Sequence, residues 1–176
     1  MTTRLQRHFN WGVLRWLLLG SVLVGTLSMA GCGFHLRGAS EFPFKTIYVA
    51  GSESTPFGAA IRRNLQGQEN AKLVNSEADA DVVLQILAER PEKVILSLTV
   101  QGLVREYTLN SYLTYQVRNS YGKIFLPPTT IVLHRTISYN ENVVLSKAAE
   151  EQMLYKDMQG DMVLQVVRRL SLLNMD

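Results

Sequence analysis

Residues 107–118 read Tyr-Thr-Leu-Asn-Ser-Tyr-Leu-Thr-Tyr-Gln-Val-Arg, and this stretch decides the fold. Its side chains alternate between apolar and polar in steps of two, which is the period of a β-strand. The apolar set is Tyr107, Leu109, Leu113, Tyr115 and Val117, and the polar set is Thr108, Asn110, Thr114, Gln116 and Arg118. The alternation predicts a long strand with one face against a core and the other in water.

The segments on either side have the same period. Residues 82–100 alternate in the same way, with a break at Arg90-Pro91. The apolar face carries Val82, Leu84, Ile86, Ala88, Val94, Leu96, Leu98 and Val100, and the opposite face carries Asp81, Gln85 and Glu89. Proline cannot donate to a sheet ladder, so we expect Pro91 at an edge or a bulge. A last strand over 123–138 has Ile131, Leu133, Ile137 and Tyr139 on one face and a second expected bulge at Pro127-Pro128. A β-branched run at 45–50 predicts a first, short strand.

Two segments have helical spacing. Thr55 and Pro56 form a helix-start signal, and apolar residues every four positions predict a helix over 55–66. A second helix is expected from a cap at Ser146 to about Leu173, with a kink or a close contact at Gly160. The order β-α-β-β-β-α predicts an α+β fold in which two helices pack on one face of a mostly antiparallel four-stranded sheet.

The N-terminus has the pattern of a secretory leader. Residues 1–15 are basic, residues 16–29 are mostly apolar, and Ala30-Gly31 precede Cys32. Fourteen apolar residues are too few for a comfortable membrane span but suit a signal peptide. Small residues directly before a cysteine resemble the lipobox of bacterial lipoproteins, which implies lipidation of Cys32 by S-diacylglycerol and N-palmitoyl groups. A free cysteine after an ordinary signal peptide, or a buried thiol, is the alternative.

The leader divides the chain into three parts: a cleaved signal peptide at 1–31, a lipidated lead-in at 32–44 and a single domain at 45–176. Gly33 follows the cysteine where the sorting rule associated with bacterial lipoproteins has Asp for inner-membrane retention, so we expect the outer membrane. The leader holds three of the 18 basic residues and no acidic one, which leaves 15 against 15 afterwards. A net charge of zero argues against a nucleic-acid partner. The single cysteine excludes an intramolecular disulfide framework.

Groups that could carry out catalysis are scarce. The two histidines after the leader, His35 and His134, are far apart in sequence and lack spaced metal-ligand partners. Asp79 and Asp81 precede a strand, where solvated carboxylates are common. We therefore predict no catalytic residues, no metal site, no cofactor and no enzymatic activity. The polar strand faces suit barrel walls or anionic headgroups, and equally an ordinary wet sheet face; they carry Lys93, Thr99, Gln101, Thr108, Tyr112, Thr114, Arg118, His134 and Thr136.

The segment after the leader, Cys32-Gly-Phe-His-Leu-Arg-Gly38, resembles the mature start of the LPS-assembly lipoprotein LptE family. Arg105-Glu-Tyr107, which opens a strand, and Leu145-Ser-Lys-Ala-Ala-Glu-Glu-Gln152, which opens the last helix, fit the same family. The resemblance implies a lipid-anchored outer-membrane protein on the periplasmic side. Such proteins lie largely within the LptD β-barrel as a plug, in an expected one-to-one complex, help that barrel assemble and bind lipopolysaccharide.

The resemblance also implies one ligand-binding residue. Lys147 lies in the matching helix-entry stretch and is the candidate for a phosphate contact on lipid A; an exposed lysine in a first helical turn is the alternative. The chain departs from the family at the hairpin, where Leu98-Thr-Val100 replaces an aromatic–arginine pair that members can carry. The alternative function is an accessory lipoprotein of another outer-membrane assembly machine.

Overall fold

The computed structural model describes residues 41–51 and 55–175. These residues belong to one compact unit, Ala39–Asp176. The expected signal peptide, Cys32 and the segment that carries the N-terminal resemblance lie outside the described residues. Within the unit the elements follow in the order β1 (Thr46–Ala50), α2 (Pro56–Gln66), β2 (Lys72–Leu73), 3-10 helix η2 (Glu77–Asp79), β3 (Val82–Leu98), β4 (Val104–Arg118), β5 (Ile124–Ser138), 3-10 helix η3 (Glu141–Val143) and α3 (Val144–Ser171).

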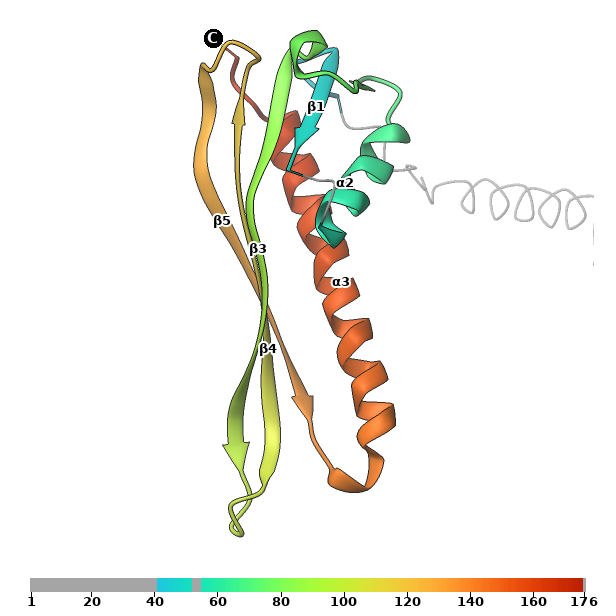
Figure 1. Cartoon of the computed structure of the whole chain (residues 1–176), viewed down its shortest axis with the longest axis vertical. Coiled ribbons are helices and arrows are strands. Elements are labelled where there is room, and N and C mark those ends of the chain that lie inside the picture. Colours follow the sequence, from blue (N-terminus) through green and yellow to red (C-terminus); the bar gives the residue numbers. More distant parts are fainter. Residues whose placement is uncertain (1–40, 52–54, 176) are drawn as a thin grey trace, which may run out of the picture. The chain divides into compact units, whose positions relative to one another are not determined.

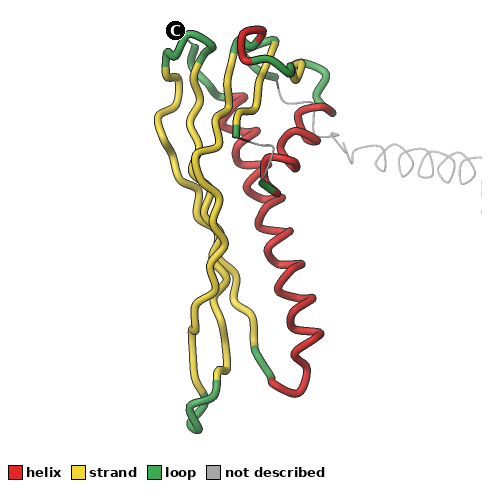
Figure 2. The backbone as a smooth tube through the Cα atoms, viewed as in Figure 1, coloured by secondary structure: helices red, strands yellow, loops and turns green. Residues whose placement is uncertain are grey.

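The strands form one mixed sheet in the order β2-β1-β3-β4-β5. The three long strands, which run side by side in Figure 2, pair antiparallel as expected. β1 instead pairs parallel with β3 and with β2. The α+β class is therefore confirmed, whereas the count of four strands was too low, because β2 has only two residues and no periodicity to reveal it.

Both helices cover the same face of the sheet, as predicted (Figure 1). The alternation of the central strand is confirmed, because its inward residues Leu109, Leu113, Tyr115 and Val117 are fully buried. They pack with a row from α3 made of Met158, Met162, Val163, Val166, Val167 and Leu170. α2 adds Phe57, Ile61 and Leu65 to the same core. The helices thus bury one face of the sheet and leave the other face bare.

β3 is one continuous strand, and Arg90-Pro91 does not interrupt it. Pro91 pairs with Ser111 of β4, while β1 pairs only as far as Gln85, so this proline lies on a free edge as expected. The expected bulge at Pro127-Pro128 is confirmed by the register shift opposite Tyr115 and Val117. Proline is tolerated at both positions because no ladder hydrogen bond is required of it there.

An unexpected bulge between Ile86 and Ala88 reverses the faces of β3. As a result Glu89, expected on the polar face, points inward and accepts hydrogen bonds at 3.2 Å from the backbone N–H of Phe57, at the start of α2. Thr55 Oγ1 accepts from Gly58 N–H at 3.0 Å, as predicted for the cap. Lys93 also lies on the inner side, where its Nζ pairs with Glu151 of α3 at 2.5 Å.

α3 differs from its prediction in two details. It begins at Val144, so Ser146 lies within the first turn, where its hydroxyl donates to the carbonyl oxygen of Val143 at 2.9 Å. Helical structure continues without a break through Gly160. A Cβ at Gly160 would meet no atom within 4 Å, so the expected close contact is absent.

The carboxylate of Glu89 completes the N-terminus of α2, and Glu89→Ala tests that role. Removal of the side chain leaves the N–H of Phe57 without its acceptor and a helix dipole without its counter-charge. We expect the free energy of unfolding in urea to fall by about 1 kcal/mol. Glu69→Ala, at an exposed glutamate just after the same helix, is the control and should leave stability unchanged. Equal effects of the two substitutions would contradict the capping role.

Candidate functional site

Within the described part of the chain, the face of the sheet opposite the two helices is left without a cover (Figure 1). Residues that pair directly across antiparallel strands share a face, so the register identifies its members. Across β3, β4 and β5 this outer face carries Arg90, Glu92, Thr108, Asn110, Tyr112, Thr114, Gln116, Arg118, Thr130, His134 and Thr136, with Ala88, Val94, Ile124 and Val132 as its apolar members. Hydroxyl, amide and charged groups predominate on this face. They lie here because the same period-two alternation directs the apolar side chains to the core on the opposite face.

Glu92 organises the middle of this outer face. Its carboxylate accepts hydrogen bonds from Arg90 at 3.0 Å, from the hydroxyl of Tyr112 at 3.0 Å and from Asn110 at 3.4 Å. The bond from Arg90 and then that from Tyr112 hold the pKa of Glu92 below its ordinary value. The Arg90 guanidinium also lies 4.2 Å from the centroid of the Tyr112 ring. The charged groups here are paired within the sheet, so the face presents polarity with little unbalanced charge.

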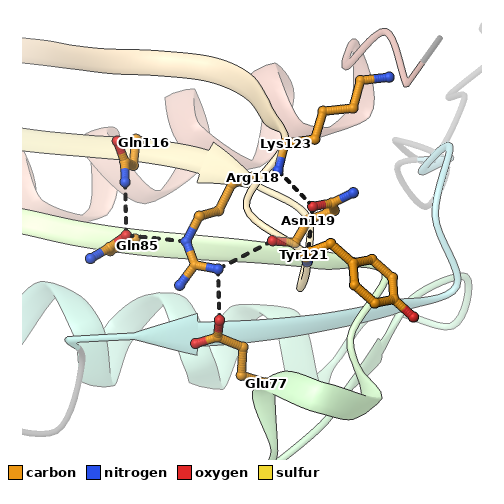
Figure 3. A network of polar contacts seen from close by, with 7 residues as sticks. All are labelled: Glu77, Gln85, Gln116, Arg118, Asn119, Tyr121 and Lys123. Carbon is orange, nitrogen blue, oxygen red and sulfur yellow. Dashed lines mark hydrogen bonds and ion pairs between the residues drawn. The ribbon is translucent and has the colours of Figure 1, made fainter.

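A second network closes the end of the outer face near η2 (Figure 3). Arg118 pairs with Glu77 at 2.6 Å, and its Nε donates to Gln85 at 3.4 Å. Gln116 donates to the same Gln85 oxygen at 2.8 Å. The hydrogen bond from Arg118 holds the pKa of Glu77 below its ordinary value. These contacts fasten η2 to β4 and fix the side chains of this end.

Asp81 has a structural role. Its Oδ2 accepts from the backbone N–H groups of Lys45 and Thr46, both at 2.9 Å, while Thr46 Oγ1 accepts from Asp81 N–H at 2.9 Å. Burial would raise the pKa of Asp81, but these hydrogen bonds outweigh it and hold the pKa below its ordinary value. Asp79 takes no part in this clamp. In the part of the chain that the structure covers, no three His, Cys, Asp or Glu side chains are placed to hold a metal ion.

Lys147 lies at the end of the first turn of α3, beside the end of β5. Its Nζ donates to Ser138 Oγ at 3.0 Å and pairs with Glu150 at 2.8 Å. The side chain is only 19% exposed, so it is held in place rather than free in water. An anion that binds here must share the ammonium with Glu150 or displace it.

The hairpin that joins β3 to β4 extends past the start of α3 (Figure 1). The sequence predicts that one apolar face of these residues is buried. That prediction is wrong, because neither helix extends over the tip of the hairpin. Val100 is 100% exposed, and about half of the side-chain surface is exposed at Val94, Ile95, Leu96, Leu98 and Leu103. Across 41–51 and 55–175 no helix has both the length and the apolar character to cross a membrane.

Comparison with known proteins assigns the family. A family model described as LptE, lipopolysaccharide-assembly, matches residues 44–170, from just before β1 to the last turn of α3. The chain belongs to the LptE family.

Individual relatives agree with this assignment. The LPS-assembly lipoprotein LptE of Pectobacterium atrosepticum is 29% identical over 162 residues, which cover 90% of this chain and 85% of the relative. The protein of the same name from Yersinia enterocolitica is 30% identical over 158 residues, 88% of this chain and 73% of the relative.

Solved structures share the fold. A lipoprotein B of Nitrosomonas europaea, known from solution NMR, superposes with a TM-score of 0.70 at 36% identity, over 79% of this chain and 90% of that one. The rare lipoprotein B of Shewanella oneidensis gives a TM-score of 0.60 at 26% identity, over 71% of this chain and 95% of that one.

The structure describes only one of the two predicted site residues. Lys147 is located and positioned, whereas Cys32 lies outside the described residues. Sequence reasoning found much of the outer face but placed Lys93 there wrongly and did not single out Glu92. It also placed Thr99 and Gln101 on a strand face, whereas both lie in the turn between β3 and β4. The signal available for Glu92 was its spacing of two residues from Arg90, which places two opposite charges on one face of a strand. Lys93 gave no such signal, because it was turned inward by the bulge after Ile86, which no residue type in the sequence marks.

Proposed function

We propose that this chain is a lipid-anchored outer-membrane protein that fills the lumen of the LptD β-barrel, assists its assembly and contacts lipopolysaccharide on its way to the outer leaflet. Family membership provides the setting, an LPS-assembly protein. One observation of the fold carries the rest: a long sheet with helices on one side only and a polar outer face on the other. The role is proposed to be non-catalytic, a matter of binding and of filling space.

The outer face suits a wet barrel wall. The interior of a large membrane barrel is polar, so a plug needs hydroxyl and amide groups that exchange hydrogen bonds with it or with trapped water. Thr114 and Thr130, whose hydroxyls lie 2.9 Å apart, and His134 are such groups. The charges of this face are mostly balanced within the sheet, so insertion would bring few unpaired charges into the lumen.

The length of the strands suits the same role. β3 has 17 residues, and at 3.3 Å per residue it extends about 55 Å. This exceeds the roughly 30 Å of bilayer hydrocarbon, so a sheet parallel to the barrel axis would reach from one mouth of the lumen to the other.

The barrel partner is tested by affinity purification of a C-terminally tagged chain from detergent-solubilised outer membranes. We expect a single large β-barrel of the LptD type at equal stoichiometry. Thr130→Arg, which puts a long charged side chain on the outer face, should greatly reduce its recovery. Gln66→Arg at the exposed end of α2 is the matched control and should leave recovery unchanged. Recovery of the chain alone, or with another envelope machine, would overturn the proposal.

Lipopolysaccharide contact through Lys147 is tested by Lys147→Asp. Loss of an ammonium–phosphate contact should weaken capture of purified lipopolysaccharide about tenfold. Barrel association should persist, and the fold should tolerate the change because an aspartate is favourable near the start of a helix. Lys156→Asp, at an exposed lysine farther along α3, is the control. Unchanged capture in the Lys147 variant would restrict Lys147 to its pairing with Glu150.

The lipid anchor is tested by Cys32→Ser in cells grown with radiolabelled palmitate. Without the thiol no diacylglycerol group can be attached, so we expect loss of the label and release of the protein in a soluble periplasmic form. Several acyl chains make membrane attachment effectively permanent, and the contrast between the two forms should therefore be complete. Continued incorporation of palmitate into the Ser variant would contradict the assignment of Cys32.

A further inference from the structure

The turn between β4 and β5 is held in one conformation by its own backbone. Asn119 N–H donates to the carbonyl of Lys123 at 2.9 Å, and Gly122 N–H donates to the carbonyl of Asn119 at 3.2 Å. The Asn119 side-chain oxygen accepts from the N–H groups of Tyr121 and Lys123 at 3.0 and 2.8 Å. Gly122 takes a φ of 93°, a left-handed conformation that glycine adopts without strain. The Arg118–Glu77 ion pair secures the base of the turn.

This rigid turn presents an aromatic side chain to solvent. Tyr121 is 95% exposed, and Figure 3 shows its ring pointing away from the polar network around Arg118. Beside it the Lys123 ammonium lies 5.6 Å from the centroid of the Phe125 ring, and Ile124 is more than half exposed. The other long hairpin turn, residues 99–103, has neither an aromatic nor a charged residue. A tyrosine next to a lysine at a fixed turn is the pattern that suits a membrane–water interface.

The turn lies next to the chain segment that leads back to Cys32. One groove of about 640 Å³ is lined both by Pro43–Lys45 and by Asn119–Tyr121, which places the turn beside the start of the described chain. Pro43 is eleven residues after Cys32, and even a fully extended chain of that length spans at most about 40 Å. An anchored chain therefore keeps this end of the domain within about 40 Å of the lipid that holds it.

We propose that the turn Asn119–Lys123 docks onto the phospholipid surface that holds the lipid anchor. The Tyr121 ring lies at the level of the headgroups, and the Lys123 ammonium lies near anionic headgroups. Because the turn is already ordered, docking costs little conformational entropy. The docked turn fixes the orientation of the sheet relative to the membrane, which an eleven-residue tether alone leaves free. This inference rests on the proposed anchor at Cys32 and not on the barrel partner.

The chain offers a clean spectroscopic test, because both of its tryptophans, Trp11 and Trp16, precede Cys32. Tyr121→Trp therefore gives the mature protein a single tryptophan at the turn. The acylated variant is reconstituted in vesicles of equal parts phosphatidylethanolamine and phosphatidylglycerol, doped with a phosphatidylcholine brominated near its headgroup. We expect a blue-shifted emission and strong quenching by bromine. Lys123→Gln in the same background should lower the ratio of docked to undocked turns about fivefold.

Val100→Trp is the matched control, since Val100 is fully exposed in the turn of the other hairpin, at the opposite end of β4. Its tryptophan should keep a water-exposed emission and escape quenching. Absence of quenching at position 121, or equal quenching at both positions, would overturn the proposal.

Disproof of the lipid anchor can be distinguished from disproof of membrane docking by the turn. Mass spectrometry of the purified protein reports whether Cys32 carries acyl groups. If it does not, the thiol of Cys32, the only cysteine in the chain, is coupled to a maleimide-headgroup phospholipid in the same vesicles. Quenching at position 121 then supports the turn even though the natural anchor has been disproved, and absence of quenching overturns the turn as well.

Discussion

The burial of alternate side chains of β4 against α3 is the interaction on which the rest of the structure depends. β4 is flanked by β3 and β5, and its inward residues belong to both hydrophobic clusters of the domain. Because successive residues of a strand point to opposite faces, the same stretch that builds the core commits the intervening polar residues to the outside. Core and outer face are thus two consequences of one pattern, and a shift of one residue would destroy both.

Period-two and helical spacing predicted the fold class, both helices and all three long strands, since these features depend on burial of one face. The parallel pairing of β1 and the two-residue β2 escaped prediction, because strand direction depends on the path of the chain and not on periodicity. The bulge after Ile86 escaped it too. It moved both Glu89 and Lys93 from the outer face to the inner face of the sheet. There Glu89 accepts from the start of α2, and Lys93 pairs with α3, and these partners are distant in the sequence.

The candidate site was predictable to the extent that it follows from the pattern. Thr108, Thr114, Arg118 and His134 lie where the alternation put them. The contact of Glu92 with Tyr112 needed the register between β3 and β4, which the sequence does not specify. Its contact with Arg90, two residues earlier on the same strand, follows from the alternation. Lys147 was selected by resemblance alone, and the structure adds the reason that its position is fixed: Ser138 of β5 and Glu150 of the next helical turn hold the ammonium.

The two ends of the domain differ in stability for a reason visible in the topology. Where β1 pairs with β3, the sheet is five strands wide and both helices cover it; this end holds the large core cluster. Toward the hairpin turn at 99–103 only the three long strands remain, and the second cluster contains just Leu109, Ile137 and Met158. Local opening costs least where few apolar groups are buried. The hairpin is therefore the part whose conformation a partner can set, while the wide end keeps the fixed arrangement of sheet and helices from which the hairpin extends.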